Sequence, residues 1–170
     1  LLGRVFMKPV DCPFAAADRE LKNLPSDVRM IMVDCHAEAT SDKQLIGRHL
    51  DGRVSAVLGT HTHVPTADEQ ILPFGTAFQC DVGMTGPHES ILGRRIDRVL
   101  TTTRTCRPEM FEVASADVRM NSTLVDVDEA DAEFDEGEQL GGDFAGDVED
   151  GQRREEALGH LLRRHAPGPT

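Results

Sequence analysis

The sequence predicts an α/β fold built from alternating strands and helices, and two observations lead to this prediction. Continuous apolar runs, typical of strands buried on both faces, occupy residues 28–36 and 54–61. Segments of helical composition stand before, between and after them, at 15–24, 41–50 and 93–103. Alternation of this kind is typical of layered α/β domains.

Each remaining element of this fold is predicted from a local signal. The apolar residues 1–7, LLGRVFM, are expected to form a first strand. Ser41 is expected to cap the helix over 41–50, and Gly52 to close it. A third buried strand is expected at 76–82.

The carboxyl-terminal part divides into two regions. Residues 110–114 and 118–128 alternate between apolar and polar side chains, which predicts a final hairpin. Residues 129–170 are acidic, contain glycine and have few large apolar side chains, so they cannot bury enough surface to offset their ordering entropy. The sequence therefore predicts a globular region at 1–128 and an acidic, mostly disordered tail at 129–170.

Charge and cysteine usage narrow the class of protein. Of the net charge of −12, residues 126–170 carry −10, because they hold 14 acids and four arginines. This balance argues against nonspecific binding to nucleic acids or to membrane surfaces. No run approaches the roughly 18 apolar residues of a membrane helix. Single, widely spaced cysteines predict reduced thiols and a cytoplasmic location. They are Cys12, Cys35, Cys80 and Cys106.

Two histidines stand on alternate positions just after a predicted strand. His61 and His63 flank a single threonine in GTHTHV, and His36 ends another predicted strand. Ligands gather at the carboxyl ends of strands in open α/β sheets, and alternate residues of extended backbone point to the same side. The three imidazoles therefore predict a metal site, although a histidine at a strand end also serves as a hydrogen-bonded structural residue.

Residues beside the histidines have two interpretations each. Asp34 and Glu38 can orient imidazoles, as carboxylates around metal ligands do, or lie in solvent at the strand end. Cys35 should face the core as inert packing. Thr60 and Thr62 are candidates for bonding backbone or holding ligands in place.

Two further residues are predicted to shape the loops around the histidines. Gly59 is expected to let the chain turn tightly as its strand ends. Asp81 starts the glycine-bearing segment DVGMTG, which is expected to border the site. Its carboxylate is expected either to cap a turn or to support the ligands.

Four blocks of sequence resemble the YmdB-type bacterial metallophosphoesterases, a branch of the calcineurin-like superfamily. They are DCHAEAT, DGRVSAVLGTHTHV, ILPFGTA and DVGMTGP, in this order, at 34–40, 51–64, 71–77 and 81–87. The resemblance covers about residues 1–128. It implies an incomplete part of an αββα sandwich, in which helices flank layered β-sheets.

The resemblance also implies an activity and a ligand set. Members of the family hydrolyse phosphodiesters, typically 2′,3′-cyclic nucleotides, at a dinuclear centre of iron or manganese. By this resemblance His36 and His61 bind one metal ion and His63 binds the other. Imidazoles suit such ions only when oxygen ligands stand beside them.

The sequence departs from the family pattern in one respect. The family's other ligands, an early Asp, a bridging Glu in a G-E-N block and an Asn in a G-N-H block, have no counterpart here, and neither does the general-acid His of the last block. No catalytic residue is therefore expected in this chain, which looks like the carboxyl half of the enzyme and should be inactive alone. Its expected partners are a small phosphodiester substrate and either a second copy or a complementing N-terminal half.

Two rival functions remain open at this point. The first is a self-sufficient mononuclear three-histidine hydrolase or cupin-like enzyme. The second is a non-enzymatic remnant whose acidic tail serves as an interaction segment.

Overall fold

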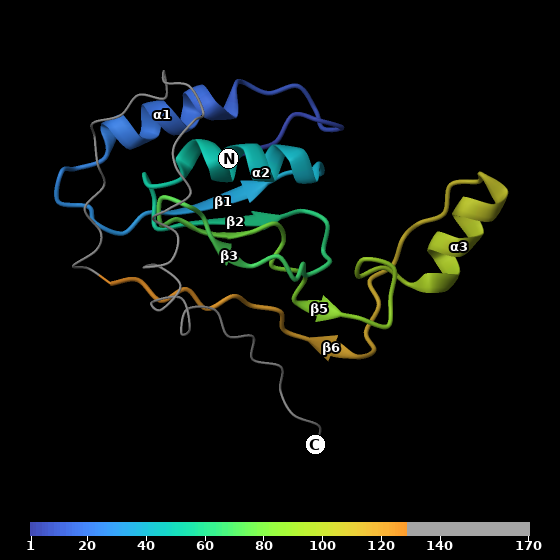
Figure 1. The fold of residues 1–170 in the computed structure, drawn as a ribbon. Helices are drawn as coiled ribbons and strands as arrows, with labels where there is room; N and C mark the ends of the chain where they lie inside the picture. The colour runs from blue at the N-terminus through green and yellow to red at the C-terminus, as the bar shows by residue number, and fades with distance from the viewer. Residues whose placement is uncertain (129–170) are drawn as a thin grey trace.

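The computed structural model describes residues 1–128, and the predicted tail at 129–170 lies outside the described residues. A four-stranded sheet has the order β1-β2-β4-β3, with β3 antiparallel to β4 and the other pairs parallel. The strands are β1 (Met32–His36), β2 (Ala56–Thr60), β3 (Gln70–Ile71) and β4 (Ala77–Gln79). Helices α1 (Pro13–Asn23) and α2 (Thr40–Leu50) alternate with them, which confirms the predicted α/β fold (Figure 1).

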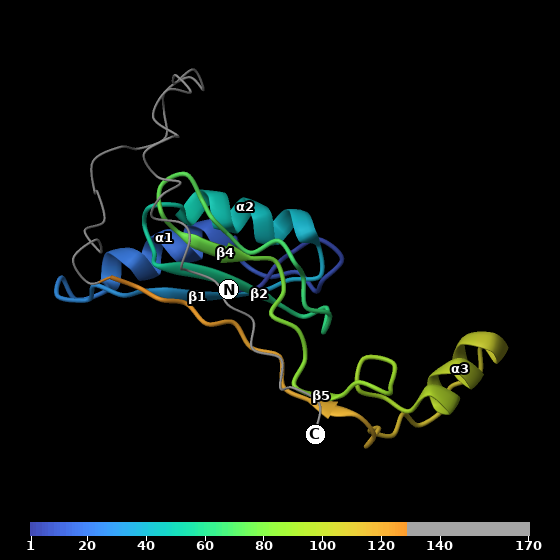
Figure 2. The same ribbon diagram turned by 60° about the horizontal axis from the view of Figure 1, so that its bottom comes forward.

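Both helices lie on the same face of this sheet, and the core forms between them and the strands (Figure 2). Cys35 of β1, Val57 of β2 and Phe78 of β4 are buried there against Ile46 and Leu50 of α2. The sheet is thus closed by helices on one side only among the described residues.

The face of the sheet opposite the helices is uncovered among the described residues, so the prediction that residues 28–36 are buried on both faces was wrong. Residues 28–36 were expected to be buried on both faces, but exposed and covered residues alternate along β1. Met30 is 54% exposed and Met32 is 63% exposed, whereas Cys35 is fully buried. Apolar side chains therefore remain uncovered on the open face of the sheet, opposite the helices.

The predicted first strand at 1–7 is reduced to a single parallel bridge between Leu2 and His36. The chain turns away immediately afterwards, because the Asp42 carboxylate accepts hydrogen bonds from the backbone N–H groups of Arg4 and Val5. Hydrogen bonds to the Asp42 side chain of α2 thus replace strand pairing from the fourth residue onward.

Helix α2 begins one residue before the expected position. Ala39 stands at its N-cap, without a side-chain cap, so the predicted capping by Ser41 is wrong. Gly52 follows the C-cap residue Asp51 and has φ of 78°, a conformation that glycine adopts without strain. Closure of the helix at Gly52 was predicted correctly.

The predicted hairpin of 110–114 with 118–128 does not form. Strand β6 (Val118–Arg119) pairs with β5 (Gly86–Pro87), and Val113 bridges to Arg94 instead. Backbone hydrogen bonds from Arg95 to Glu112 and from Ala114 to Gly93 bind this segment to the residues before helix α3 (Ile96–Thr105). Partners elsewhere in the chain thus satisfy both halves of the expected hairpin.

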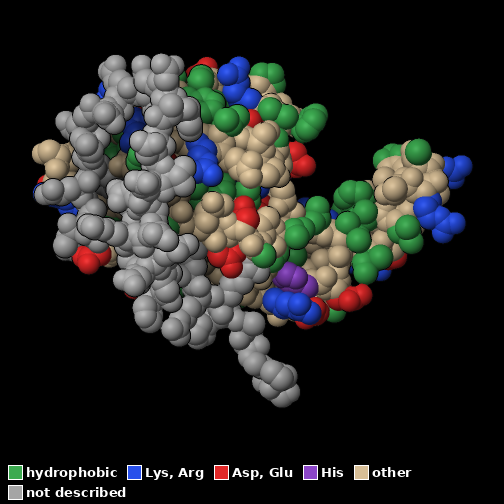
Figure 3. All heavy atoms as spheres, viewed as in Figure 1, with side chains coloured by type: hydrophobic (Ala, Val, Ile, Leu, Met, Phe, Trp, Pro, Cys, Tyr) green, Lys and Arg blue, Asp and Glu red, His purple; other side chains and the backbone are tan. Residues whose placement is uncertain are grey.

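Helix α3 extends away from the main sheet and buries none of its residues (Figure 1). Ion pairs of Arg95 with Glu112 and of Arg98 with Glu109 join it to the segment that follows. Hydrophobic side chains remain exposed along this arm (Figure 3), among them Leu92, Leu100 and Val113. Its amphipathic pattern is therefore not used for packing within the described residues.

All four cysteines are free, and two of them are buried in the core. Burial raises the pKa of the Cys35 thiol to about 11 and that of the Cys80 thiol to about 12. Neither thiol is therefore a nucleophile near neutral pH, which agrees with inert packing at Cys35.

None of the helices in the part of the chain that the structure describes has both the length and the apolar composition needed to cross a membrane.

Gly59 has a different role from the one predicted. It lies within β2 rather than at a turn, and a Cβ atom added there would come within 1.7 Å of the carbonyl oxygen of Cys80. Its carbonyl oxygen accepts a hydrogen bond from the backbone of Val82. A side chain is excluded because two backbone segments approach closely here.

We therefore expect Gly59→Ala to lower the free energy of unfolding by at least about 3 kcal/mol, because rigid backbone atoms must move apart. Gly75→Ala is the matched control, since Gly75 has φ of 102° but nothing within 4 Å of an added Cβ. It should cost only about 1–2 kcal/mol of left-handed strain. Urea unfolding of both variants measures the difference, and equal losses would contradict this account.

Candidate metal centre

The ends of two parallel strands bring two of the predicted histidines together. His36 is the last residue of β1 and pairs in register with Thr60, the last residue of β2, and His61 follows directly. His36 Nε2 lies 3.0 Å from His61 Nδ1, and the rings meet edge to face at 82°. Two ring nitrogens from different strands therefore point at each other.

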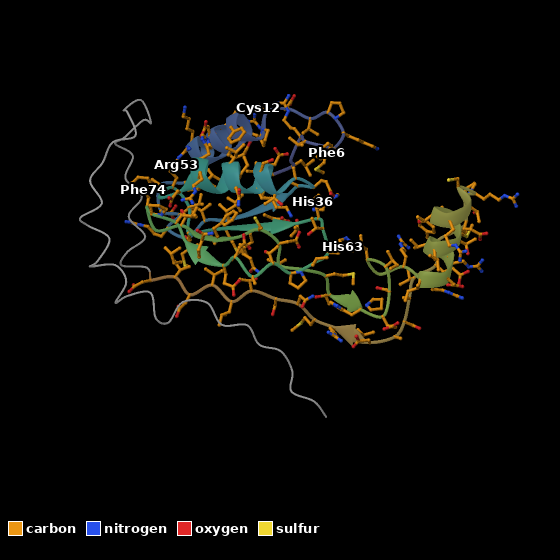
Figure 4. The ribbon with its side chains drawn as sticks, turned by 45° about the vertical axis from the view of Figure 1, so that its right-hand side comes forward. Phe6, Cys12, His36, Arg53, His63 and Phe74 are labelled. Carbon is orange, nitrogen blue, oxygen red and sulfur yellow. The ribbon has the colours of Figure 1, made fainter. Side chains whose placement is uncertain are left out.

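This pair lies on the open face of the sheet. Cys35 faces the core, as expected, so alternation along β1 places Asp34 and His36 on the side opposite the helices. Figure 4 shows His36 at the carboxyl end of the sheet, where ligands gather in α/β folds. The position of His36 agrees with the prediction from the sequence.

A relay of hydrogen bonds orients His36. Thr60 Oγ1 donates a hydrogen bond of 2.7 Å to Asp34 Oδ1 and lies 3.0 Å from His36 Nδ1. Thr60 thus contacts the imidazole and Asp34 contacts Thr60, while Asp34 also remains exposed to solvent at the strand end.

A carboxylate also supports the second imidazole. Glu38 Oε2 lies 2.9 Å from His61 Nε2, the nitrogen on the far side of the ring from His36. Glu38 comes from the short link between β1 and α2, so both supporting carboxylates come from the DCHAEAT block. In each histidine, one ring nitrogen therefore contacts Thr60 or Glu38, and the other faces the ring of the second histidine.

His63 lies at the same end of the sheet as His36 (Figure 4). The sequence argument assumed extended backbone over 61–63, and this was wrong. His61 has φ of 104° and His63 has φ of 65°, so the chain turns between them. Within residues 1–128, no group of three or more His, Cys, Asp and Glu side chains is arranged to hold a metal ion by itself.

Asp81 causes this turn. Its Oδ2 accepts hydrogen bonds from the backbone N–H of Thr62 at 3.0 Å and from the Thr62 hydroxyl at 2.6 Å. Its Oδ1 accepts a hydrogen bond from the backbone N–H of Gly83. Asp81 thus caps a turn, as one of the two predicted roles required, and it also holds Thr62, the residue between the two histidines.

Lys43 is a residue of this site that sequence reasoning missed. Its ammonium group lies 2.8 Å from Asp81 Oδ2, and both side chains are only 2% exposed. Lys43 stands on the buried stripe of α2 with Ile46, Gly47 and Leu50. A lysine at an apolar position of an amphipathic helix is the signal that could have identified it.

The charge of Asp81 is set by these contacts. Burial alone favours the neutral carboxyl, but hydrogen bonds from Lys43, Thr62 and Gly83 outweigh it, so the pKa of Asp81 lies below its usual value. The carboxylate is therefore ionised at neutral pH and can hold the Thr62 loop.

The histidine pair has the donor chemistry of a partial metal site. Ring nitrogens that bind one ion at right angles, at about 2.0–2.1 Å each, are separated by about 3 Å. The observed separation between His36 and His61 is 3.0 Å, and each distal nitrogen meets an oxygen, as in metal-bound histidines. These two residues fit a divalent cation, and further oxygen ligands would be needed to complete its coordination.

Comparison with known proteins identifies the family. A sequence model of the family described as YmdB-like protein matches residues 1–140. The chain belongs to this family. A Bacillus subtilis (strain 168) protein named 2′,3′-cyclic-nucleotide 2′-phosphodiesterase is 45% identical over 129 residues, which cover 76% of this chain.

Two solved structures of similar proteins support the same assignment. A hypothetical protein from Thermus thermophilus is 49% identical with a TM-score of 0.66, over 68% of this chain and 45% of that one. A novel phosphatase from Mycoplasma pneumoniae is 37% identical with a TM-score of 0.61, over 67% of this chain and 41% of that one. This YmdB-like chain spans about half the length of the curated relative, of which 49% is matched.

We expect Lys43→Met to lower the free energy of unfolding by about 3–5 kcal/mol, because it leaves the buried Asp81 carboxylate without its cation. Lys22→Met is the matched control on the exposed end of α1 and should change stability by less than about 0.5 kcal/mol. Denaturant unfolding measures both. A Lys43→Met/Asp81→Asn double variant should recover part of the loss, and additive losses would refute the pairing.

Asp81 also predicts a loss of stability in acid. Because its pKa is lower in the folded chain than the usual value of about 3.9, its contribution is present above about pH 4 and disappears as the pH falls further. Between pH 5 and pH 3, the unmodified chain should therefore lose more free energy of unfolding than Asp81→Asn does. Parallel slopes for the two proteins would contradict this assignment.

Proposed function

We propose that this YmdB-like chain contributes half of a dinuclear metal site in an enzyme that hydrolyses phosphodiesters, with 2′,3′-cyclic nucleotides as its substrate class. The observation that carries the proposal is the 3.0 Å approach of His36 Nε2 to His61 Nδ1, with the opposite nitrogen of each ring held by Thr60 or Glu38. The similar Bacillus subtilis protein, named as a phosphodiesterase of that class, supports the substrate assignment.

In this proposal His36 and His61 hold one divalent ion, iron or manganese, and His63 holds a second. Bound cations offset the negative charge of a phosphodiester and promote attack by water in line with the leaving oxygen. The residues of this chain position the ligands. Asp34 acts through Thr60, Glu38 acts on His61, and Asp81 fixes the turn that presents His63.

The oxygen ligands that such a site needs are proposed to come from a complementing N-terminal half. Imidazoles are neutral ligands, so on their own they leave the charge of two dications without compensation. The open face of the sheet, where His36 lies and Met32 is exposed, offers this half a place to pack. The general acid near the leaving oxygen is assigned to the same missing half.

The rival mononuclear site receives no support from the geometry. It requires three imidazoles at one ion, and the described residues bring two of them together. The rival role of the acidic tail concerns residues outside the described part of the chain.

The isolated 170-residue chain is therefore not expected to hydrolyse 2′,3′-cyclic AMP measurably with added Mn²⁺. Joining it to an N-terminal half that carries the missing Asp, Glu, Asn and His should restore turnover, because the oxygen ligands and the acid are then present. The formation of adenosine monophosphate by ring opening, at saturating substrate, is the measurement.

Two variants of the joined protein make this test specific. His61→Ala should abolish turnover, whereas His49→Ala should leave it unchanged, because His49 bonds Asp18 between α1 and α2. Hydrolysis by the isolated chain that disappears in its own His61→Ala variant would show that the site is already complete here.

A further inference from the structure

An exposed aromatic side chain lies at the end of the molecule that carries the histidines. Phe6 is 89% exposed, more than any other large hydrophobic residue in the described part of the chain. It lies at the same end as His36 and His63, whereas Phe74 lies at the opposite end (Figure 4). Phe6 therefore takes almost no part in the core, and its ring is available to a ligand at this end of the sheet.

The backbone before Phe6 ties it to the end of β1. Leu2 forms a parallel bridge with His36, and the N–H group of Gly3 donates a hydrogen bond of 3.0 Å to the His36 carbonyl oxygen. Phe6 follows Gly3 by three residues, and a chain of three residues reaches about 10 Å at most. A mononucleotide bridges distances of this order between its phosphate and its base. One substrate molecule can therefore extend from the histidine pair to Phe6.

Phe6 is also held in an unfavourable backbone conformation. Its φ of 60° lies in the left-handed region, which bulky residues rarely adopt. The turn is fixed by Asp42 Oδ2, which accepts hydrogen bonds of 2.7 Å from the N–H of Arg4 and 2.9 Å from that of Val5. Strain of this kind persists only where other contacts impose it, and it is concentrated at ligand-binding positions. Here the contacts hold an aromatic ring in solvent.

We propose that Phe6 is a specificity-determining residue that stacks on the nucleobase of the substrate while the phosphodiester is bound at the histidine pair. This inference rests on the proposed function, which places the phosphodiester beside His36 and His61. Every nucleobase has a flat π face, so an aromatic side chain binds it by stacking without reading which base it is. The site therefore favours cyclic nucleotides over base-free cyclic phosphodiesters and discriminates little among the four bases.

Kinetics of the joined enzyme with two substrates test this role. The first substrate is 2′,3′-cyclic AMP, and the second is methyl riboside 2,3-cyclic phosphate, in which a methoxy group replaces the base. Phe6→Ala should raise the KM for 2′,3′-cyclic AMP about 5- to 100-fold with little change in kcat, because stacking is the same in the ground state and the transition state. The KM for the base-free substrate should not change. Phe6→Tyr keeps the ring and should behave as the unmodified enzyme does.

Phe74→Ala is the matched control, because Phe74 is 70% exposed at the opposite end of the sheet (Figure 4). It should leave both KM values unchanged. An equal effect of Phe6→Ala on the two substrates would overturn the proposal, because it would show that Phe6 packs against the complementing half instead of against the base. Unchanged kinetics with 2′,3′-cyclic AMP would overturn it as well.

Nucleoside binding supplies a measurement that needs neither metal nor turnover. Adenosine, which has no phosphate, is titrated into the metal-free joined protein, and the phenylalanine rings are followed by NMR. The Phe6 signals, identified by their absence from Phe6→Leu, should move upfield under the ring current of adenine, whereas ribose should not move them. Unmoved Phe6 signals at saturation of the solution with adenosine would overturn the proposal. Failure of the joined enzyme to hydrolyse either cyclic phosphate would instead refute the proposed function and leave the adenosine result unaffected.

Discussion

The buried contact between Lys43 and Asp81 is the interaction on which the site depends. A carboxylate that is 2% exposed stays ionised only if cations and donors surround it, and Lys43 supplies the charge. Once ionised, Asp81 accepts both hydrogen bonds from Thr62 and the one from Gly83. One ion pair thereby joins α2, the end of β2 and the loop after β4. A buried pair adds little net stability over an apolar replacement, and here it holds Asp81 where the H-x-H turn is bound.

Helices cover one face of the sheet among the described residues, so the core lies on that face and the proposed metal site lies on the other. Helices α1 and α2 bury the face that carries Cys35, Val57 and Phe78, and this face forms the core. The opposite face carries His36 and Thr60 at one end, and the exposed side chains of Met32 in β1 and of Met30 before it. A chain that spans about half of its curated relative can thus form its own core while His36, a proposed ligand, lies on the uncovered face.

The sequence was sufficient for the three helices, for the strands β1, β2 and β4, and for the approach of His36 to His61. Apolar runs define buried strands, and parallel strands bring their carboxyl ends to one edge. It was insufficient where a distant polar group overrides the local pattern. The first strand ends early because the Asp42 carboxylate accepts hydrogen bonds from backbone N–H groups that would otherwise continue it. The expected hairpin does not form because residues 112–114 bond the backbone of residues 93–95 instead. Lys43 was missed because binary patterning assigns a lysine to the surface, whereas its partner lies 38 residues away.

The backbone of the H-x-H turn shows why a threonine separates the two histidines. Positive φ at His61 and His63 costs on the order of 1–3 kcal/mol per residue, and such strain persists only where other contacts impose it. The Thr62 backbone and hydroxyl both bind Asp81, so the middle residue supplies the contacts that hold its neighbours. Valine at position 62 would keep the backbone hydrogen bond but lose the hydroxyl contact. In HTH, the central threonine therefore binds Asp81 and holds the turn, while the imidazoles of His61 and His63 do not take part in that contact.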